Sequence, residues 1–337
     1  MFGWRRRSGA VAPAAAARAA ANDAAPVFDP ERLLRQLEWT VLRRLDGILQ
    51  GDYRTLFRGF GLDFADLREY QAHDDVRHID WNVTARMQAP YVREFQEDRE
   101  VAAWFVLDLS RSLDFGSHRL RKRELAAALV GVLARLFIRY GNRVGAVMLA
   151  ESGAEVVPAR AGRPQVLRVL DRMRKLGTHA PGSRGRSGAV TNLSALLESA
   201  QPTMRRRSVV FVISDFISQP GWEKQLAGLA RRHEVIAVRL FDPLEMELPN
   251  LGLVVMEDAE TGEQMTVDTH DPAFRRRFAR AAEQREDALR SALATAGIDC
   301  LELSTADPID AALLRFSRLR KRRSQLAAGG VPAGAGM

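Results

Sequence analysis

The chain has 337 residues, 46% hydrophobic and 27% charged, so it can bury one large core or two smaller ones and belongs to neither the fibrous nor the disordered class. Its net charge of +8 would suit an anionic partner, but much of the excess is arginine near the two ends and in Arg205–Arg207. A single cysteine excludes an intrachain disulfide, and the six histidines lack the spacing of a zinc site.

The N-terminal stretch is rich in alanine and arginine, and it contains no apolar core typical of a signal peptide, so residues 1–27 are predicted to be a disordered tail. Apolar residues at helical spacing predict a helix over residues 28–49, with Asp29 and Pro30 at its start. Nowhere do eighteen apolar residues follow one another without a charge, so we expect no membrane span and a soluble, cytoplasmic protein.

Residues 28–100 are predicted to form a small leader domain, in which the helix is followed by short strands with a dense mixture of charges. Asp74 and Asp75 could be a catalytic carboxylate pair. They could also belong to a web of arginine–carboxylate pairs that locks the leader together, and this is favoured because no nucleophile or base neighbours them. The proposed structural charge network comprises Arg68, Asp74, Asp75, Arg77, Asp80 and Arg86.

Residues 101–320 alternate short apolar runs with longer amphipathic stretches, which predicts an α/β fold with a doubly wound, mostly parallel sheet. A short partner over 154–157 is expected at an antiparallel edge, and a hairpin over 254–256 and 265–267. Residues 321–337 are predicted to be a second disordered tail. The expected strands cover 102–107, 143–150, 208–213, 234–240 and 298–303, and the expected helices cover 117–140, 165–176, 192–200, 221–232, 272–296 and 309–319.

The strand over 102–107 ends in Asp108, Ser110 and Ser112, a spacing that lets three side-chain oxygens of one loop converge on a hard divalent cation. By itself, Asp-x-Ser-x-Ser is equally typical of an ordinary loop. A second buried strand delivers Asp215 at its end, and Thr191 lies just before a predicted helix. All five candidates are therefore oxygen donors at the ends or edges of α/β elements.

Further motifs occur along both domains. They include Arg58-Gly-Phe-Gly61, Arg68-Glu-Tyr70, Asp74-Asp75, Arg77-His-Ile-Asp-Trp81, Thr191-Asn-Leu193, Arg206-Arg-Ser208, Ile213-Ser-Asp-Phe216, Arg232-His233 and Asp242-Pro243. With these motifs, residues 51–320 resemble the family called domain of unknown function 58 (DUF58), and the serine loop resembles the metal-ion-dependent adhesion site (MIDAS) of von Willebrand factor A (vWA) domains. The chain departs from the family at His73, commonly glycine, and at Leu113, often methionine, and neither is a proposed ligand.

The resemblance implies a vWA-like, Rossmann-like fold that binds Mg²⁺, or Mn²⁺ or Ca²⁺, at Asp108, Ser110, Ser112, Thr191 and Asp215. In such a site the three hydroxyls bind the ion directly, while the two carboxylates act mainly through water or as hydrogen-bond acceptors. The resemblance also implies a protein partner, a MoxR-type AAA+ ATPase, and an acidic residue of the partner that completes the metal shell. We therefore predict a noncatalytic adaptor in protein assembly or maturation.

Two alternatives belong to other functional classes. A metal-dependent phosphohydrolase could use Asp108 as nucleophile, but Ser110 stands where a second carboxylate is usually needed, and neither strand-exit loop contains a lysine. A nucleic-acid-binding protein could use Arg205–Arg207 and the basic tails, but no interleaved aromatic residues support this.

Overall fold

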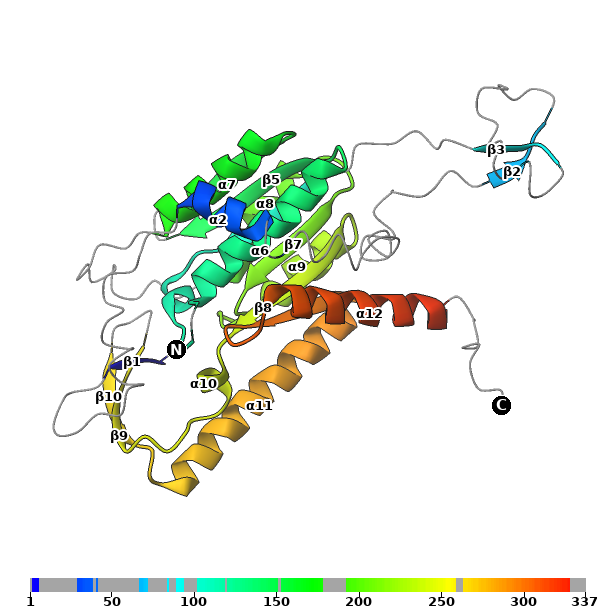
Figure 1. The fold of residues 1–337 in the computed structure, drawn as a ribbon. Coiled ribbons are helices and arrows are strands. Elements are labelled where there is room, and N and C mark those ends of the chain that lie inside the picture. The colour runs from blue at the N-terminus through cyan, green and yellow to red at the C-terminus, as the bar shows by residue number, and fades with distance from the viewer. Residues whose placement is uncertain are drawn as a thin grey trace.

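The computed structural model describes residues 2–5, 29–38, 41, 67–71, 84, 89–93, 102–118, 120–150, 153–177, 192–258 and 263–327. Its main body is a six-stranded sheet with helices on both faces (Figure 1). Five of the six strands run parallel, and the sixth is antiparallel. The predicted fold class, α/β with a doubly wound and mostly parallel sheet, is confirmed.

The strand order places a topological reversal in the middle of the sheet. From β4 the chain moves outward through β5 to β6, and it then returns to the other side of β4 and continues through β7 and β8 to β11. Ligands of open α/β sheets bind at the carboxyl ends of the strands, where the order reverses. Here that point lies between β4 and β7. The order across the sheet is β11 (Asp299–Ser304), β8 (Glu234–Phe241), β7 (Val209–Ser214), β4 (Ala102–Asp108), β5 (Arg143–Ala150) and β6 (Gly153–Arg160).

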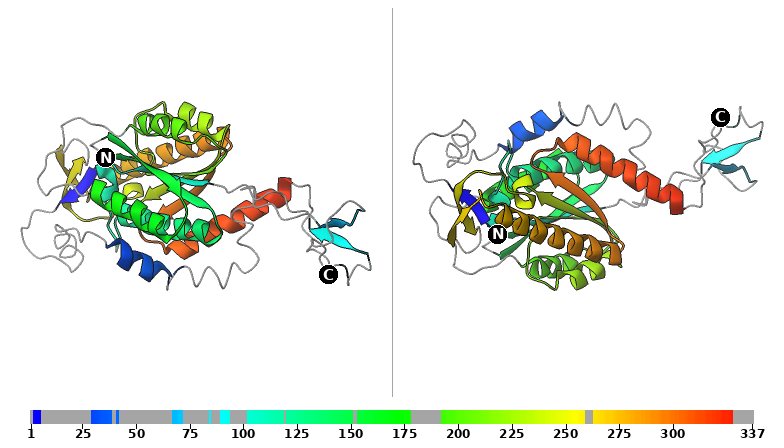
Figure 2. Two further views of the ribbon diagram at one scale, coloured as in Figure 1. Left: turned by 90° about the horizontal axis from the view of Figure 1, so that it is seen from above. Right: turned by 90° about the horizontal axis from the view of Figure 1, so that it is seen from below.

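The central strands are apolar throughout because both of their faces are covered. In β4, Phe105 and Leu107 face one core, while Trp104 and Val106 face the other. Figure 2 shows the two helical layers on either side of the sheet. One layer contains α2 (Pro30–Leu37), α6 (Lys122–Arg139), α7 (Arg163–Leu176) and α12 (Ile309–Ala327), and the other contains α8 (Leu193–Ala200), α9 (Trp222–Ala230) and α11 (Pro272–Thr295).

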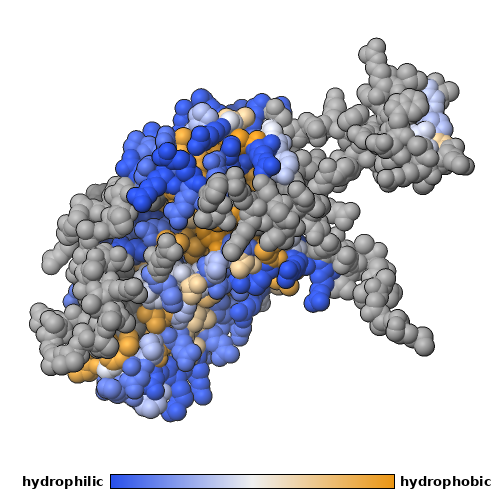
Figure 3. Space-filling view, in the orientation of Figure 1, coloured by the Kyte–Doolittle hydropathy of each residue, from blue (hydrophilic) through white to orange (hydrophobic). Residues whose placement is uncertain are grey.

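A second, three-stranded sheet lies beside the main body. Its hairpin, β9 (Leu253–Asp258) and β10 (Gln264–Asp268), packs on Phe274 and Phe278 of α11. Leu253 is 69% exposed, and Figure 3 shows an apolar patch over this hairpin on a mainly hydrophilic face. The third strand, β1 (Phe2–Arg5), pairs with the edge of β9, although the sequence predicts a disordered tail there.

Three further differences separate the structure from the expected elements. Helix α12 continues to Ala327, whereas the sequence places the end of the α/β domain at residue 320. Helix α6 begins at Lys122 rather than at residue 117, because Ser117 is held outside the helix by Asp242. Strand β6 spans eight residues, more than the 154–157 expected. Three short helices complete the described elements: η3 (Arg111–Asp114), η4 (Gln201–Thr203) and α10 (Pro243–Met246).

In the leader, the described elements after α2 are β2 (Leu67–Glu69) and β3 (Tyr91–Arg93), which pair antiparallel. Arg68 of the proposed charge network lies in β2, but Asp74, Asp75, Arg77, Asp80 and Arg86 lie outside the described residues, so the network stays a prediction. Among the helices that the structure describes, none combines the length and the apolar character that crossing a membrane requires.

Candidate metal and interaction site

Four of the five predicted ligands lie together where the strand order reverses, and we call Asp108, Ser110, Ser112 and Asp215 the candidate site. Asp108 ends β4, and its Oδ2 accepts a hydrogen bond from Ser214 Oγ, 2.9 Å away at the end of β7. Asp108 Oδ1 accepts one from the amide of Ser110 at 3.0 Å, and the Ser110 and Ser112 hydroxyl oxygens lie 2.9 Å apart. The fifth predicted ligand, Thr191, lies outside the described residues.

Asp108 is a buried carboxylate whose charge is poorly compensated. It is 1% exposed, and burial, followed by the negative charge of Asp215, raises its pKa to about 6. The bonds from Ser110 and Ser214 offset this only in part, and both donors are neutral groups. A cation placed beside Asp108 would therefore be strongly favoured.

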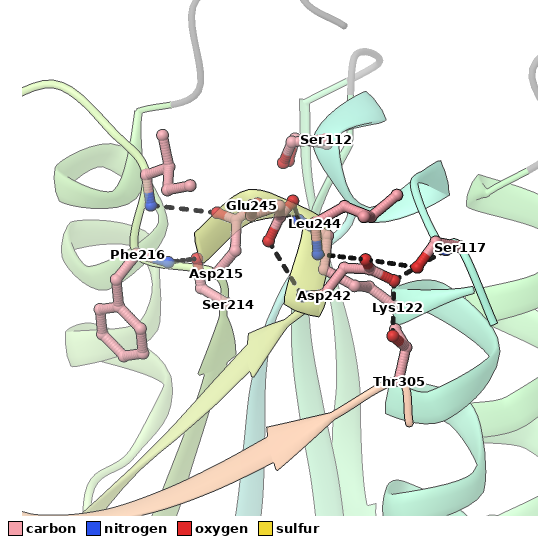
Figure 4. Close-up of polar contacts among 12 residues, drawn as sticks. Ser112, Ser117, Lys122, Ser214, Asp215, Phe216, Asp242, Leu244, Glu245 and Thr305 are labelled. Carbon is pink, nitrogen blue, oxygen red and sulfur yellow. Dashed lines mark hydrogen bonds and ion pairs between the residues drawn. The ribbon is translucent and has the colours of Figure 1, made fainter. Parts of the chain in front are cut away.

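Asp215 faces a cation that the sequence analysis missed. Its Oδ2 accepts a hydrogen bond from Lys122 Nζ at 2.9 Å, while its Oδ1 accepts one from the amide of Ile217 at 3.0 Å. The same ammonium lies 2.7 Å from Glu245 Oε1 in α10 (Figure 4). Burial lowers the pKa of Lys122, but the charges of Asp215 and Glu245 outweigh it, so the pKa lies above its usual value and the side chain stays charged.

The position of this lysine in the structure explains why it needs carboxylate partners. Lys122 is the first residue of α6, where a positive charge opposes the helix dipole. A lysine that is also fully buried at such a position needs carboxylates close by. The sequence does not reveal this lysine, because it lies in α6 and not in either strand-exit loop.

A second aspartate, Asp242, connects three strand ends beside the candidate site. Its Oδ1 accepts hydrogen bonds from Ser117 Oγ at 2.6 Å and from the amide of Leu244 at 2.9 Å. Its Oδ2 accepts bonds from the amide of Ser117 at 2.7 Å and from Thr305 Oγ1 at 2.5 Å (Figure 4). Burial alone would raise the pKa of Asp242, but these bonds outweigh it and hold the pKa below its usual value.

Arg123 fixes the backbone of the serine loop. Its Nη2 donates to the carbonyl oxygens of Leu109 at 3.3 Å and Ser110 at 3.1 Å, and its Nε lies 2.5 Å from Asp114 Oδ1. Asp114, in the short helix over residues 111–114, therefore anchors this arginine. Gly177 leaves room for it, because a Cβ there would come within 2.4 Å of Arg123 Nη1.

The donor set fits a small, hard divalent cation. In the part of the chain that the structure describes, no group of three Asp, Glu, His or Cys side chains is placed to hold a metal ion, so a metal site here would need hydroxyl ligands. Octahedral Mg²⁺ holds oxygen ligands at about 2.1 Å, which places neighbouring ligands about 2.9 Å apart. The Ser110 and Ser112 oxygens, which share a hydrogen bond, are 2.9 Å apart and so are compatible with this spacing, and both aspartates beside them are buried.

The structure also bears on the two alternatives. For a phosphohydrolase, neither strand-exit loop supplies a lysine, and Lys122, which reaches the site from α6, has its ammonium fully buried against two carboxylates. Arg205–Arg207 are exposed before β7, at the amino end of the sheet and opposite the candidate site.

Comparison with known proteins places the chain in a family. A family model described as "Protein of unknown function DUF58" matches residues 66–288. The uncharacterized protein Rv1480 of Mycobacterium tuberculosis is 38% identical over 289 residues, which covers 86% of this chain and 89% of that protein.

Among solved structures, BatB from Bacteroides thetaiotaomicron aligns with a TM-score of 0.39 and 14% identity, covering 67% of this chain and 99% of that one. The SpRpn10 VWA domain aligns with a TM-score of 0.35 and 12% identity, covering 64% and 93%. Scores this low carry no information on the site. The match over residues 66–288 and the similarity to Rv1480 show that the chain belongs to the DUF58 family of proteins of unknown function.

Proposed function

We propose that this protein is a noncatalytic interaction module that binds a partner protein through a divalent cation, Mg²⁺ or alternatively Mn²⁺ or Ca²⁺. The ion would be held by Ser110, Ser112 and Thr191, with Asp108 and Asp215 acting through water or as hydrogen-bond acceptors. The observation that carries the proposal is the environment of Asp108. This buried carboxylate accepts hydrogen bonds from neutral donors and is repelled by the charge of Asp215. The hydroxyl oxygens of Ser110 and Ser112, in the same loop, are 2.9 Å apart, a spacing compatible with neighbouring ligands of one ion.

Each part of the site has its own task. The two buried aspartates supply the negative charge, while Ser110 is partly exposed and so can be reached from outside. Arg123 and Asp242 hold the surrounding loops in place. A bound ion with few direct carboxylate ligands remains electrophilic, so it would supply a positive charge that attracts a carboxylate of the partner.

For the partner, we propose a MoxR-type AAA+ ATPase in the cytoplasm, with the present chain as its adaptor in protein assembly or maturation. This part of the proposal rests on the family resemblance. The acidic side chain that completes the metal shell would belong to the ATPase or to its client.

The test combines calorimetry with affinity capture. We expect wild type to bind Mg²⁺ and to retain a co-expressed MoxR-type ATPase in Mg²⁺ but not in EDTA, and we expect S110A to lose both properties. S199A is the matched control, since Ser199 Oγ donates within α8 to the carbonyl of Leu196. Capture that is unchanged by both EDTA and S110A would contradict the proposal.

The noncatalytic assignment has a separate test. Wild type and D108N would be incubated with Mg²⁺ and a chromogenic phosphomonoester, because a phosphohydrolase of this type depends on Asp108 as nucleophile. We expect equal background rates. Turnover by wild type that is abolished in D108N would favour the phosphohydrolase.

A further inference from the structure

Lys122 places a permanent positive charge against one of the proposed metal-binding residues. Its ammonium is fully buried and lies 2.9 Å from Asp215 Oδ2 and 2.7 Å from Glu245 Oε1. Figure 4 shows it reaching in from α6, between the loop that follows β7 and α10. The ammonium and a divalent cation in the candidate site would therefore both draw on the charge of Asp215, the ion directly or through a bound water.

The charges of this buried group determine what it can bind. Asp108, Asp215 and Glu245 contribute three carboxylates, and Lys122 contributes one ammonium, so the ionised group carries a net charge of −2. One divalent cation would neutralise it. Without the ammonium the same pocket would carry −3, and electrostatic attraction for a divalent cation would rise steeply in this poorly solvated environment.

Glu245 gives the ammonium a second partner that does not depend on Asp215. Its Oε2 also accepts a hydrogen bond from the amide of Asp242 at 3.1 Å, so its carboxylate is fixed at the start of α10. Lys122 would thus stay in place if Asp215 turned toward a metal.

We propose that Lys122 is a built-in cation that competes with the divalent ion for Asp215 and so holds the affinity of the site for divalent ions down. Glu245 retains the ammonium whichever partner Asp215 takes. This inference deepens the proposed function and rests on it. As a consequence, the site would bind the divalent ion weakly and reversibly. Such binding suits an interaction with a partner that must later be released.

A purely structural ion pair makes a different prediction. If Lys122 only stabilises the fold, K122M lowers stability to the same extent with and without metal, because removing one partner leaves buried charges unpaired. If Lys122 competes with the ion, K122M is destabilised in EDTA and recovers in Mg²⁺, since the ion then neutralises the carboxylates.

The experiment measures Mg²⁺ affinity by calorimetry and the midpoint of thermal unfolding in EDTA and in Mg²⁺, on the full chain at pH 8. We expect K122M to bind Mg²⁺ at least about tenfold more tightly than wild type. E245Q keeps the shape of the side chain but removes one negative charge, so its affinity should fall several-fold. R320M is the control, because Arg320 bridges Glu234 and Asp299 near the amino ends of β8 and β11.

The outcomes separate this inference from the proposed function. Wild-type binding with unchanged or weaker binding by K122M overturns the inference and leaves the metal site intact. Binding by K122M but not by wild type supports the inference in its strongest form, and absence of binding by both overturns the inference and the proposed function. If K122M does not fold, E245Q decides, since equal or tighter binding than wild type would overturn the inference.

Discussion

Asp108 and Asp242 are both fully buried aspartates at the carboxyl ends of parallel strands, yet their surroundings are opposite. Asp242 accepts four hydrogen bonds, from Ser117, Leu244 and Thr305, and its pKa lies below the usual value. Asp108 accepts hydrogen bonds from the amide and the hydroxyl of Ser110 and from the hydroxyl of Ser214, but it also faces the charge of Asp215, and its pKa is about 6. The hydrogen bonds of Asp242 satisfy its charge, whereas Asp108 retains a charge that a cation could compensate.

Buried aspartates at the ends of parallel strands therefore serve two different purposes in this protein. The bonds of Asp242 link the loops that follow β4, β8 and β11, so its charge stabilises the fold. The charge of Asp108 opposes folding in the absence of a cation, a cost that is understandable at a binding site. Four measurements test whether the two aspartates differ in this way.

The largest effect is expected from Asp242→Ala. The substitution removes the acceptor of four hydrogen bonds, which come from the exposed Ser117, the partly buried Leu244 and the buried Thr305. We expect the free energy of unfolding to fall by about 3–5 kcal/mol in urea titrations at pH 7. A loss below about 1 kcal/mol would show that Asp242 does not hold these loops together.

Asp108→Asn should act in the opposite direction in EDTA at pH 8. Because folding raises the pKa of Asp108 from 3.8 to about 6, the native protein binds this proton more tightly than the unfolded chain does. The contribution of Asp108 to stability therefore falls as the pH rises from about 4 to 6, by about 3 kcal/mol in total. Urea titrations across this range should show the decline in wild type and its absence in D108N.

Addition of Mg²⁺ in excess should stabilise wild type at pH 8. At one hundred times the dissociation constant, binding to the native state alone contributes about 2.7 kcal/mol. The shift in thermal midpoint should disappear in D108N. It should persist in T305S, because the hydroxyl of Thr305 donates its hydrogen bond to Asp242. Equal shifts in wild type and D108N would place the ion elsewhere.

The smallest effect is expected on stability at acid pH. The pKa of Asp242 is lowered by folding, so its stabilising contribution is present above the ordinary value of 3.8 and is lost as the pH falls through the lower value in the native state. The gap in stability between wild type and D242N should therefore narrow below about pH 4. A gap that widens toward acid would show that the pKa is raised instead.

Much of the fold could be predicted because its signals are local. The apolar runs over 102–107 and 209–213 are too short for helices and apolar on both faces, as buried parallel strands are. Strand β1 could not be predicted in this way, since it exists by pairing with β9, more than 250 residues away. Likewise, Arg320 and Arg323 in the last turns of α12 form ion pairs with Asp299, contacts that the local pattern does not reveal.

The candidate site could likewise be predicted only in part. Asp108, Ser110, Ser112 and Asp215 follow apolar runs directly, so their meeting at adjacent strand ends could be inferred from the pattern. Glu245 and Asp242 could not be placed, because Lys122 and Ser117, their partners, lie more than a hundred residues away in the sequence. Pairings of this length leave no periodic trace in a single sequence.

The two ends of the segment 178–191 are both attached near the site. Gly177 lies against Arg123, which holds the serine loop, and the amide of Leu193 donates to Ser218 Oγ, 2.9 Å away, just beyond Asp215. Arg123 on one side and Ser218 on the other therefore fix the points at which the described chain leaves this edge of the sheet after α7 and returns to it before α8.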